Sequence, residues 1–476
     1  MSHAVTQLLN THRKGQERLR VLSASGQLGF GIVAESFERG LERRPHFIGC
    51  DMGSIDPGPF FLGSGQMAAP QAMVRRDLEL VLRGARSLNV PLIIGSAGTA
   101  GAKPHLVSTL ALLADVARAN AWSIRVATVA SDVPAQVLID ARHQGRLRAL
   151  DASPSALHLP LPDEAQLRAC THRVAQCGTD TLIRALHSEP DVVIAGRACD
   201  TAIFAALPQM LGYDRALSLH MAKIIECTSL CCEPGGRDAM LAELGPDDFI
   251  LESMNPRLKA TPTSVAAHAL YEQASPWEVE EPEGVLDLRH ARYQALDERR
   301  TCVSGATFLP RESPTFKVEA ATRVGARAVL VAGVSDPQLI ARIDEVIDQV
   351  QAKVKAMLPG DWQLFRHVYG QGAVTALAPE LRSAHEIGLV LEFIAEHMDD
   401  ALTAASVFKQ NLLHASFDQR LCTGGNLAFA FTPSEWEAGI SYRFVVYHVL
   451  EGVSPDDLFV HEVHDWQAHE PQRALA

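Results

Sequence analysis

Short apolar runs alternate with amphipathic stretches through the first half of the chain. The runs are typical of strands buried on both faces and lie at Leu19–Ala24, His46–Asp51, Leu92–Gly95, Ile124–Ala130 and Val192–Ala195. Between them, apolar residues recur at helical spacing in Met73–Leu88, Leu106–Ala119 and Pro134–Leu147. This alternation predicts an α/β domain over residues 1–235, with a Rossmann-like, mostly parallel sheet flanked by helices.

The pattern changes after this first domain. Residues 236–300 are rich in Pro, Gly and Glu, which predicts a connecting region with one helix near Ser264–Glu272. Residues 301–476 form strand-like and helical groups, which predicts an α+β C-terminal domain. Its expected strands are Phe316–Glu319, Ala328–Val334 and Tyr442–Leu450, and its expected helices are Pro337–Met357 and Ser383–Leu413.

Composition and charge narrow the class of protein. The chain has 476 residues, of which 47% are hydrophobic and 21% charged, as in an ordinary folded protein. Its formal net charge of −13, without a Lys/Arg block, argues against nucleic acid as a partner. No apolar run is long enough to span a membrane and the N-terminus lacks a secretory signal, so we expect a cytoplasmic protein. The nine Cys form no CxxC pair and favour neither a disulfide scaffold nor a zinc ribbon.

Four strands of the first domain are each followed by a Gly-rich or polar loop. These loops are Ser25–Gly31, Asp51–Gly58, Gly95–Lys103 and Gly196–Asp200. In an open parallel sheet, ligands bind outside the carboxyl ends of the strands. We therefore expect the four loops to form one ligand cleft, although each could be only a tight turn.

Three other motifs suggest chemistry but fit their patterns poorly. Gly26, Gly29 and Gly31, with Asp51 ending the next strand, partly match an NAD(P) fingerprint but lack its GxGxxG spacing. Asp51 also has the position of the nucleophile in Gly49-Cys-Asp-Met-Gly53, but a loop follows where a nucleophile elbow needs a helix. His461 and His464, with His469, have the form of a metal cluster, although a solvated tail is the commoner origin of such a pattern.

Two pairs of charged residues, Arg197 with Asp200 and Lys223 with Glu226, are candidates for catalysis or binding. Arg197 offers bidentate binding of an anionic group, and Asp200 either joins it or caps a helix. Cys199 between them is expected to be a small packing residue. Lys223 and Glu226 share a helical face and form either an acid–base pair or a surface salt bridge.

Taken together, the motifs of the chain resemble those of the acyclic terpene utilisation protein A (AtuA) family, from about residue 21 to residue 463. The loop at Asp51–Ser54 and Asp56–Pro59 is similar to a subgroup variant of the family's second-strand loop. The other matching stretches are Leu92–Gly98 with Lys103–His105, Val193–Asp200, Ile225–Cys227, Thr261–Tyr271, Gly333–Pro337, His367–Gly370 and Thr423–Phe429.

The resemblance implies a cytosolic enzyme of bacterial catabolism, acting on acyclic terpenes or other branched or carboxylated carbon sources. Hydration or dehydration is the chemistry it suggests. Many members carry, or are encoded beside, a small ferredoxin-like domain. Because this chain ends without room for such a domain, we expect a separate ferredoxin-like partner, and we also expect a homo-oligomer. The resemblance supplies no residue roles.

We therefore expect a lyase or hydratase acting on a small branched or unsaturated carboxylic acid or its CoA thioester. Glu226 or Asp51 is the expected base, and Lys103 or His105 the expected acid. A cradle for the developing enolate is expected from Arg197 and the backbone at Gly95–Thr99. The full set of expected substrate-binding residues is Arg197, Asp200, Gly26, Gly29, Ser54, Gly95, Ser96, Gly98 and Thr99.

This chemistry requires no metal or redox cofactor. Two alternatives remain open. One is an NAD(P)-dependent oxidoreductase, and the other is a non-catalytic subunit that binds a ligand and stabilises a partner.

Overall fold

The chain folds into two compact units in the computed structural model. The model describes residues 3–150, 159–271, 273–375, 378, 381–420 and 424–467, so Glu272, Thr423 and His469 lie outside the described residues. Unit 1 contains Met1–Thr322 and Phe444–Ala476, and unit 2 contains Arg323–Arg443. The predicted boundaries at residues 235 and 300 are therefore wrong, because unit 2 is an insertion and the chain returns to unit 1 after it.

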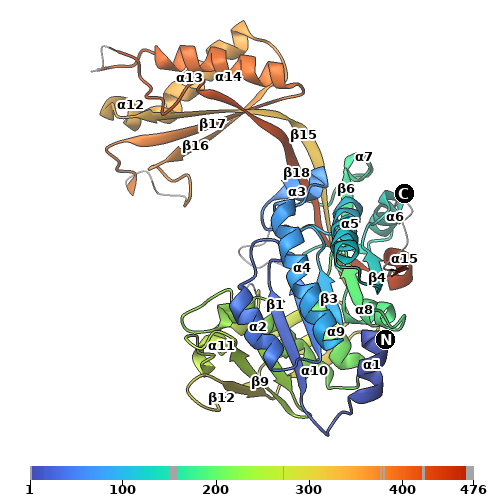
Figure 1. The fold of residues 1–476 in the computed structure, drawn as a ribbon. Helices are drawn as coiled ribbons and strands as arrows, with labels where there is room; N and C mark the ends of the chain where they lie inside the picture. Colours follow the sequence, from blue (N-terminus) through green and yellow to red (C-terminus); the bar gives the residue numbers. More distant parts are fainter. Residues whose placement is uncertain are drawn as a thin grey trace. The chain divides into compact units, whose positions relative to one another are not determined.

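Unit 1 is built on a ten-stranded sheet with the order β12-β13-β9-β8-β1-β2-β3-β7-β4-β19 (Figure 1). Its five central strands are mutually parallel. They are β1 (Leu19–Ser25), β2 (Phe47–Asp51), β3 (Leu92–Gly95), β7 (Val192–Ala195) and β4 (Ile124–Ala130). Each matches a predicted strand to within one residue.

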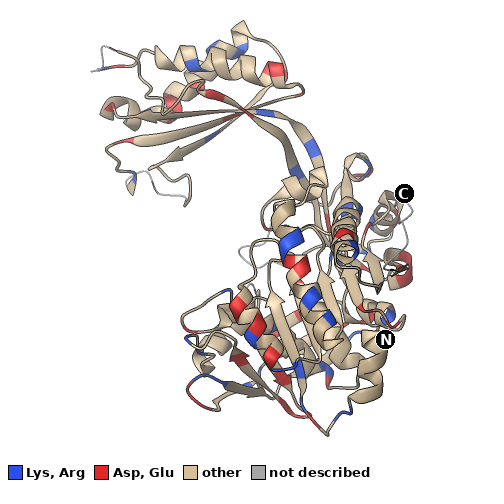
Figure 2. Cartoon of the chain, in the orientation of Figure 1, with Lys and Arg blue, Asp and Glu red and all other residues tan. Residues whose placement is uncertain are grey.

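Helices cover both faces of this sheet. One face carries α2 (Ala34–Glu42), α3 (Pro59–Ser64), α4 (Gln71–Leu88) and α5 (Lys103–Ala119). The opposite face carries α8 (Thr179–Leu186), α9 (Asp200–Met210) and α10 (Arg215–Ile225). Almost all of α9 and α10 is buried, because α10 packs over α9 and both join the larger hydrophobic core. The exposed surfaces of α2 and α4 carry acidic and basic residues side by side (Figure 2).

Antiparallel strands complete both edges of the sheet. On the β1 side these are β8 (Met240–Leu244), β9 (Asp248–Ser253), β13 (Thr301–Ser304) and β12 (Arg292–Ala295). A small sheet of β10 (Glu278–Glu281), β11 (Gly284–Asp287) and β14 (Thr307–Pro310) lies in the same part of the chain, as does α11 (Pro262–Ala269). The prediction of a connecting region over 236–300 is wrong, because these short strands pair with one another and join the main sheet through the pairing of β8 with β1.

The histidines near the C-terminus lie on the opposite edge strand, β19 (Val460–Trp466), which pairs with β4. His461 and His464 are three residues apart, so their side chains project from opposite faces of the strand. They cannot share a metal ion, and the segment is not a solvated tail. The predictions of a metal cluster and of a solvated tail at His461 and His464 are therefore both wrong.

The remaining described elements of unit 1 are short. They are α1 (Ala4–Thr11), α6 (Ala135–His143), β5 (Leu147–Ala149), α7 (Glu164–Ala169), β6 (His172–Ala175), the 3₁₀ turn η1 (Thr228–Cys231) and α15 (Pro455–Leu458).

Unit 2 has the order β-α-β-β-α-β of a split βαβ fold. Its strands are β16 (Gln363–Tyr369), β17 (Ile387–Ala395) and the parts of β15 (Thr315–Val334) and β18 (Glu435–Glu451) that lie within residues 323–443. They belong to a sheet with the order β16-β17-β15-β18-β5, in which β6 also pairs with β15. Its helices are α12 (Pro337–Ala341), α13 (Ile343–Met357) and α14 (Met398–Leu413), and α13 and α14 lie on one face of the sheet (Figure 1).

One predicted helix of unit 2 is wrong. Ser383–Leu413 is not a single helix, because its first half forms β17 and only its second half forms α14. Leu389, Leu391 and Phe393 alternate with less buried positions and face the core, which is the period of a strand with one buried face.

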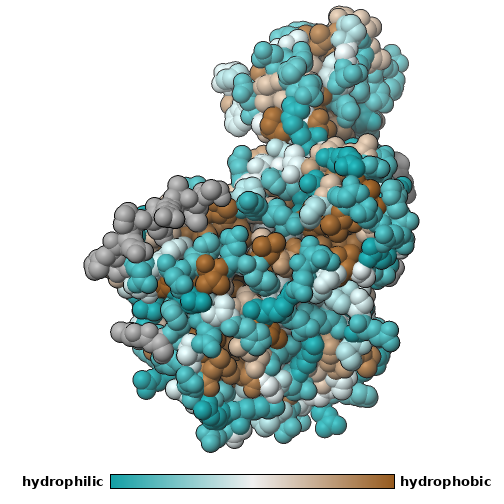
Figure 3. Space-filling view, turned by 90° about the vertical axis from the view of Figure 1, so that its right-hand side faces the viewer, coloured by the Kyte–Doolittle hydropathy of each residue, from teal (hydrophilic) through white to brown (hydrophobic). Residues whose placement is uncertain are grey.

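The described residues contain no helix that is long and apolar enough to cross a membrane. On the face seen in Figure 3, hydrophilic residues predominate and apolar residues form scattered patches.

Candidate functional site

A pocket of about 320 Å³ opens at the carboxyl edge of the parallel strands of unit 1. It is lined by parts of the loops after β1 and β2, by Asp200 at the start of α9, by parts of residues 226–237 and by Tyr271. The chain leaves the neighbouring strands β3 and β7 toward opposite faces of the sheet, and ligands of open α/β sheets bind near such a point.

Three of the four Gly-rich loops predicted to converge therefore line this pocket. The fourth, at Gly95–Lys103, lies behind it, where Gly95 accepts a hydrogen bond from the Met52 N–H (3.1 Å). Gly26 makes the convergence possible, because a Cβ at this position would lie only 2.8 Å from the carbonyl oxygen of Glu226. Without a side chain there, the loop after β1 can contact the end of α10.

Asp77 on α4 holds the loop after β1 in place. Its fully buried carboxylate accepts N–H groups from Gly29 (3.0 Å), Gly31 (3.0 Å) and Ile32 (3.1 Å). Asp77 is not among the residues predicted from the sequence, although a charged residue on the otherwise apolar stripe of an amphipathic helix is a signal for such a role.

This contact bears on the NAD(P) alternative. In dinucleotide-binding folds, backbone N–H groups of this loop and of the following helix bind the pyrophosphate. Here the N–H groups of Gly29, Gly31 and Ile32 already bind the protein's own carboxylate. The residues present do not fit a dinucleotide at this loop.

We expect Asp77→Asn to lower the free energy of unfolding by about 2–4 kcal/mol, because an amide cannot accept all three N–H groups and leaves buried donors unpaired. Urea unfolding measures the change. Asp115→Asn, at an exposed ion pair on α5, is the control and should change stability by less than about 0.5 kcal/mol. Equal stability of the two variants would contradict the assigned role.

Asp51 is a buried carboxyl group on the floor of the pocket. Its side chain is 5% exposed, and its Oδ2 accepts the Gly53 N–H at 3.0 Å. Its Oδ1 has no hydrogen-bond partner among the described residues. Burial and the nearby Asp200 carboxylate raise the pKa of Asp51 well above its usual value, against the opposing effect of Arg197. Asp51 therefore holds a proton far more readily than an exposed carboxyl group.

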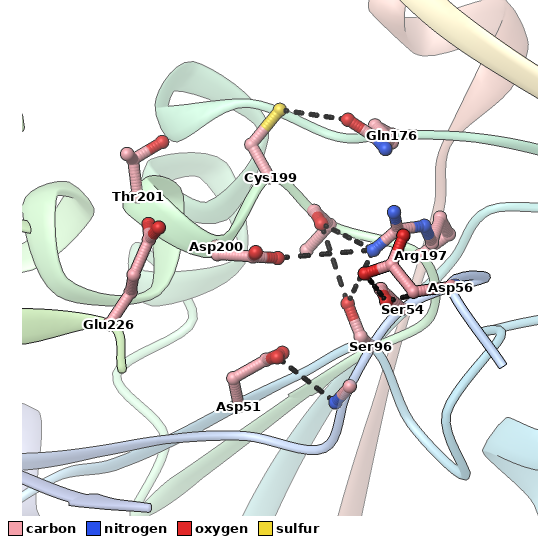
Figure 4. Close-up of polar contacts among 12 residues, drawn as sticks. Asp51, Ser54, Asp56, Ser96, Gln176, Arg197, Cys199, Asp200, Thr201 and Glu226 are labelled. Atoms are coloured by element: carbon pink, nitrogen blue, oxygen red, sulfur yellow. Dashed lines mark hydrogen bonds and ion pairs between the residues drawn. The ribbon is translucent and has the colours of Figure 1, made fainter. Parts of the chain in front are cut away.

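Lys223 and Glu226 form a buried ion pair at the end of α10. The Lys223 Nζ lies 2.5 Å from the Glu226 Oε1, and the two residues are only 5% and 4% exposed. Burial disfavours the ammonium form, but the Glu226 and Asp200 carboxylates more than offset this and raise the pKa of Lys223. The alternative of a surface salt bridge is therefore wrong. Glu226 lines the pocket with Asp51 and Asp200 (Figure 4).

Arg197 does not line the pocket. Its guanidinium binds both oxygens of the buried Glu319 (2.9 and 3.3 Å). It also donates to Ser96 Oγ at 3.1 Å (Figure 4). Its Nη1 also lies 3.9 Å from Asp200, which does line the pocket. The prediction that Arg197 binds the substrate is wrong, because its guanidinium already makes a bidentate contact with Glu319.

We expect Arg197→Met to lower the free energy of unfolding by about 3–5 kcal/mol, because the buried Glu319 loses its bidentate partner and keeps only the Lys317 ammonium, 3.6 Å away, as a counter-charge. The double variant with Glu319→Gln should recover much of this loss. Chemical denaturation of the parent and both variants measures the effect. A single variant as stable as the parent would contradict the assignment.

Cys199 fits the expected packing role. Its thiol donates to Gln176 Oε1 at 3.6 Å, and burial, with Glu281 and Glu283 nearby, raises the pKa of the thiol well above its usual value. The thiolate needed of a nucleophile is therefore disfavoured.

The expected acids Lys103 and His105 lie outside the pocket. Lys103 is exposed at the start of α5. His105 is buried, its Nδ1 accepts the Ala102 N–H, and its Nε2 pairs with the Gln66 carbonyl oxygen at 3.0 Å. It is a structural cap of α5, and its role as an acid is corrected. The other expected binding residues divide into those that line the pocket, Gly26 and Ser54, and those that do not, Gly29, Gly95, Ser96, Gly98 and Thr99.

Arg237 is a pocket residue that the sequence analysis missed. It is exposed, and it has no ion pair with another described residue. It directly follows Gly235 and Gly236, and this Pro- and Gly-rich segment was assigned to a connection. A Gly pair followed by Arg was the available signal, because such loops often bind anions.

The described residues hold one group of three side chains arranged as metal ligands are, His12, Glu17 and His46. His46 Nδ1 accepts the Arg20 N–H at 2.8 Å. Burial and Arg20 lower the pKa of His46 to about 4. The Nε2 of His46 lies 3.4 Å from Glu17 Oε1 but also 3.3 Å from the Arg20 guanidinium, so a positive charge already stands beside the nitrogen that a metal ion would need. The group therefore does not fit a metal ion.

The fold and the site together define an α/β protein with an acidic pocket at the carboxyl edge of a parallel sheet. The family model described as acyclic terpene utilisation family protein AtuA matches residues 71–239 and 257–436. The chain belongs to this family, which confirms the resemblance inferred from its motifs and associates the protein with the utilisation of acyclic terpenes. No curated protein and no solved structure matches the chain significantly. Asp51 lies before the matched residues, whereas Asp200 and Glu226 lie within them.

Proposed function

We propose that the protein is a hydro-lyase of acyclic terpene utilisation, which adds or removes water on a small branched or unsaturated carboxylic acid or its CoA thioester. The observation that carries this proposal is a pair of buried carboxyl groups in opposite electrostatic environments on one pocket. Asp51 holds a proton readily, whereas Glu226 is bound to the Lys223 ammonium. Two carboxyl groups whose environments differ in this way are typical of a paired acid and base.

In the dehydration direction, Glu226 removes the proton from Cα of a β-hydroxy substrate. The electron pair of the broken C–H bond forms the C=C bond as the Cβ–O bond breaks. Asp51 gives its proton to the departing hydroxyl, which leaves as water. Solvent exchange then returns the proton from Glu226 to Asp51, and hydration follows the same steps in reverse.

Lys223 has a positioning role in this proposal. Its ammonium holds the Glu226 carboxylate in one orientation and keeps that carboxylate ionised. Arg237 replaces Arg197 as the candidate cation for an anionic part of the substrate. A separate ferredoxin-like subunit and a homo-oligomeric state belong to the proposal on the family resemblance alone.

Hydrogen exchange at Cα tests the proposal directly. The protein is incubated in D₂O with saturated, β-hydroxy and α,β-unsaturated branched acids and their CoA thioesters, and NMR follows deuterium at Cα and the interconversion of hydroxy and unsaturated forms. Exchange that depends on Glu226 supports the proposal. Tight ligand binding without exchange or interconversion, also with a partner subunit added, would favour the non-catalytic alternative.

A further inference from the structure

We infer that the pocket takes a phosphopantetheine-type acyl thioester, whose acyl end lies at Asp51 and Glu226 and whose phosphate binds Arg237 at the pocket mouth. This inference rests on the proposed function and decides between its two substrate forms, free acid and thioester.

The charge of the pocket carries the first step. Among the described residues, four carboxyl groups line it, from Asp51, Asp56, Asp200 and Glu226, and one cation does so, Arg237. The two cations nearest the floor are already neutralised, since Lys223 pairs with Glu226 and Arg197 with Glu319. A free carboxylate at the reacting end would therefore meet like charge, whereas a thioester carbonyl is uncharged.

The chemistry of proton removal gives the second step. A proton next to a free carboxylate is hard to remove, because the product carries two negative charges on adjacent oxygens. Next to a thioester, the enolate carries only one. The Oδ1 of Asp51 has no hydrogen-bond partner among the described residues, so in its protonated form Asp51 is free to give its proton to the departing hydroxyl as the Cα–H bond breaks.

The mouth of the pocket gives the third step. Arg237 lies there beside two exposed apolar side chains, Leu230 (46% exposed) and Tyr271 (42% exposed). An amphipathic arm can pack against these side chains while its anionic end reaches the guanidinium. The described lining thus combines buried carboxyl groups with exposed apolar side chains and an exposed cation, which are the groups that the acyl end, the arm and the phosphate of such a thioester need.

Equilibrium binding tests the inference without turnover. One saturated branched acyl group, which cannot be dehydrated, is presented as the free acid, the pantetheine thioester and the CoA thioester. We expect the CoA thioester to bind the parent protein about tenfold more tightly than the pantetheine thioester, and the free acid to bind most weakly. Arg237→Ala should remove the difference between the two thioesters, whereas Arg257→Ala, at an exposed arginine outside the pocket, should keep it.

Tightest binding of the free acid would overturn the inference, as would an Arg237→Ala variant that keeps the preference for CoA. A carrier-protein thioester that binds more tightly than the CoA thioester would keep the phosphopantetheine class and change only its source. Failure of the proposed function is a separate result, because it is measured as absent hydrogen exchange on a ligand that still binds.

Discussion

Glu226→Gln is expected to lower kcat for the dehydration by roughly 10²–10⁴-fold, because the variant keeps the shape of the side chain but removes the group that accepts the Cα proton. Binding of the saturated thioester should persist, since the amide still fills the same space. Single-turnover kinetics with a β-hydroxy thioester measures the chemical step, and hydrogen exchange at Cα reports proton removal independently.

The variant leaves the Lys223 ammonium buried without its partner, which costs about 3–5 kcal/mol of stability. A double variant of Lys223→Met and Glu226→Gln removes both charges and keeps the test usable if the single variant unfolds. Glu79→Gln, at an exposed ion pair on α4, is the matched control. Near-normal exchange in a folded Glu226→Gln protein would make Glu226 structural.

Asp51→Asn is expected to abolish dehydration and to stabilise the fold at neutral pH. Unfolded Asp has a pKa near ~3.9, whereas burial and Asp200 hold the pKa of folded Asp51 well above its usual value. Between these two pKa values the folded state binds more protons, so the free energy of unfolding falls as the pH rises through the window. The side-chain amide of the Asp51→Asn variant does not titrate, so the free energy of unfolding of the variant does not fall in this way.

Thermal unfolding from pH 4 to pH 9 measures the effect, with the difference in Tm between variant and parent growing as the pH rises. The rate of the parent should fall over the same range, because dehydration needs the protonated form of Asp51. Asp115→Asn, at an exposed ion pair on α5 outside the pocket, is the control and should leave both profiles unchanged. A parent Tm that rises through this range, with no gain in the variant, would contradict the protonated state of Asp51.

The parallel strands could be predicted because strands buried on both faces are continuous apolar runs, as in Leu92–Gly95. The antiparallel edge could not, since it is held by pairing across long sequence separations, such as Leu19 with Leu244. β17 was missed for another reason. Its alternating pattern runs directly into the helical pattern of α14, and without a turn signal between them the two resemble one helix.

The residues of the candidate site could be predicted where a titratable side chain stands at the end of a strand or directly after an apolar run. Asp51 ends β2 and Glu226 follows Ile225, and both line the pocket. The role of Arg197 could not be predicted, because Glu319, which takes up its fork, is 122 residues away along the chain. His105 shows the same limit, since a capping role depends on backbone groups whose positions no spacing reveals.

The carboxylate of Asp77 competes with any nucleotide phosphate for the N–H groups of the loop after β1. A side chain fixed on α4 has a high effective concentration at the loop, so a dissolved phosphate must displace a tethered competitor. Leu28→Gly, which would complete the GxGxxG spacing from Gly26 to Gly31, would therefore gain nothing by itself. A nucleotide could bind at this loop only after Asp77 was replaced by another residue. The loop would then have to fold around the phosphate of the nucleotide, because the Asp77 carboxylate that now holds it would be gone.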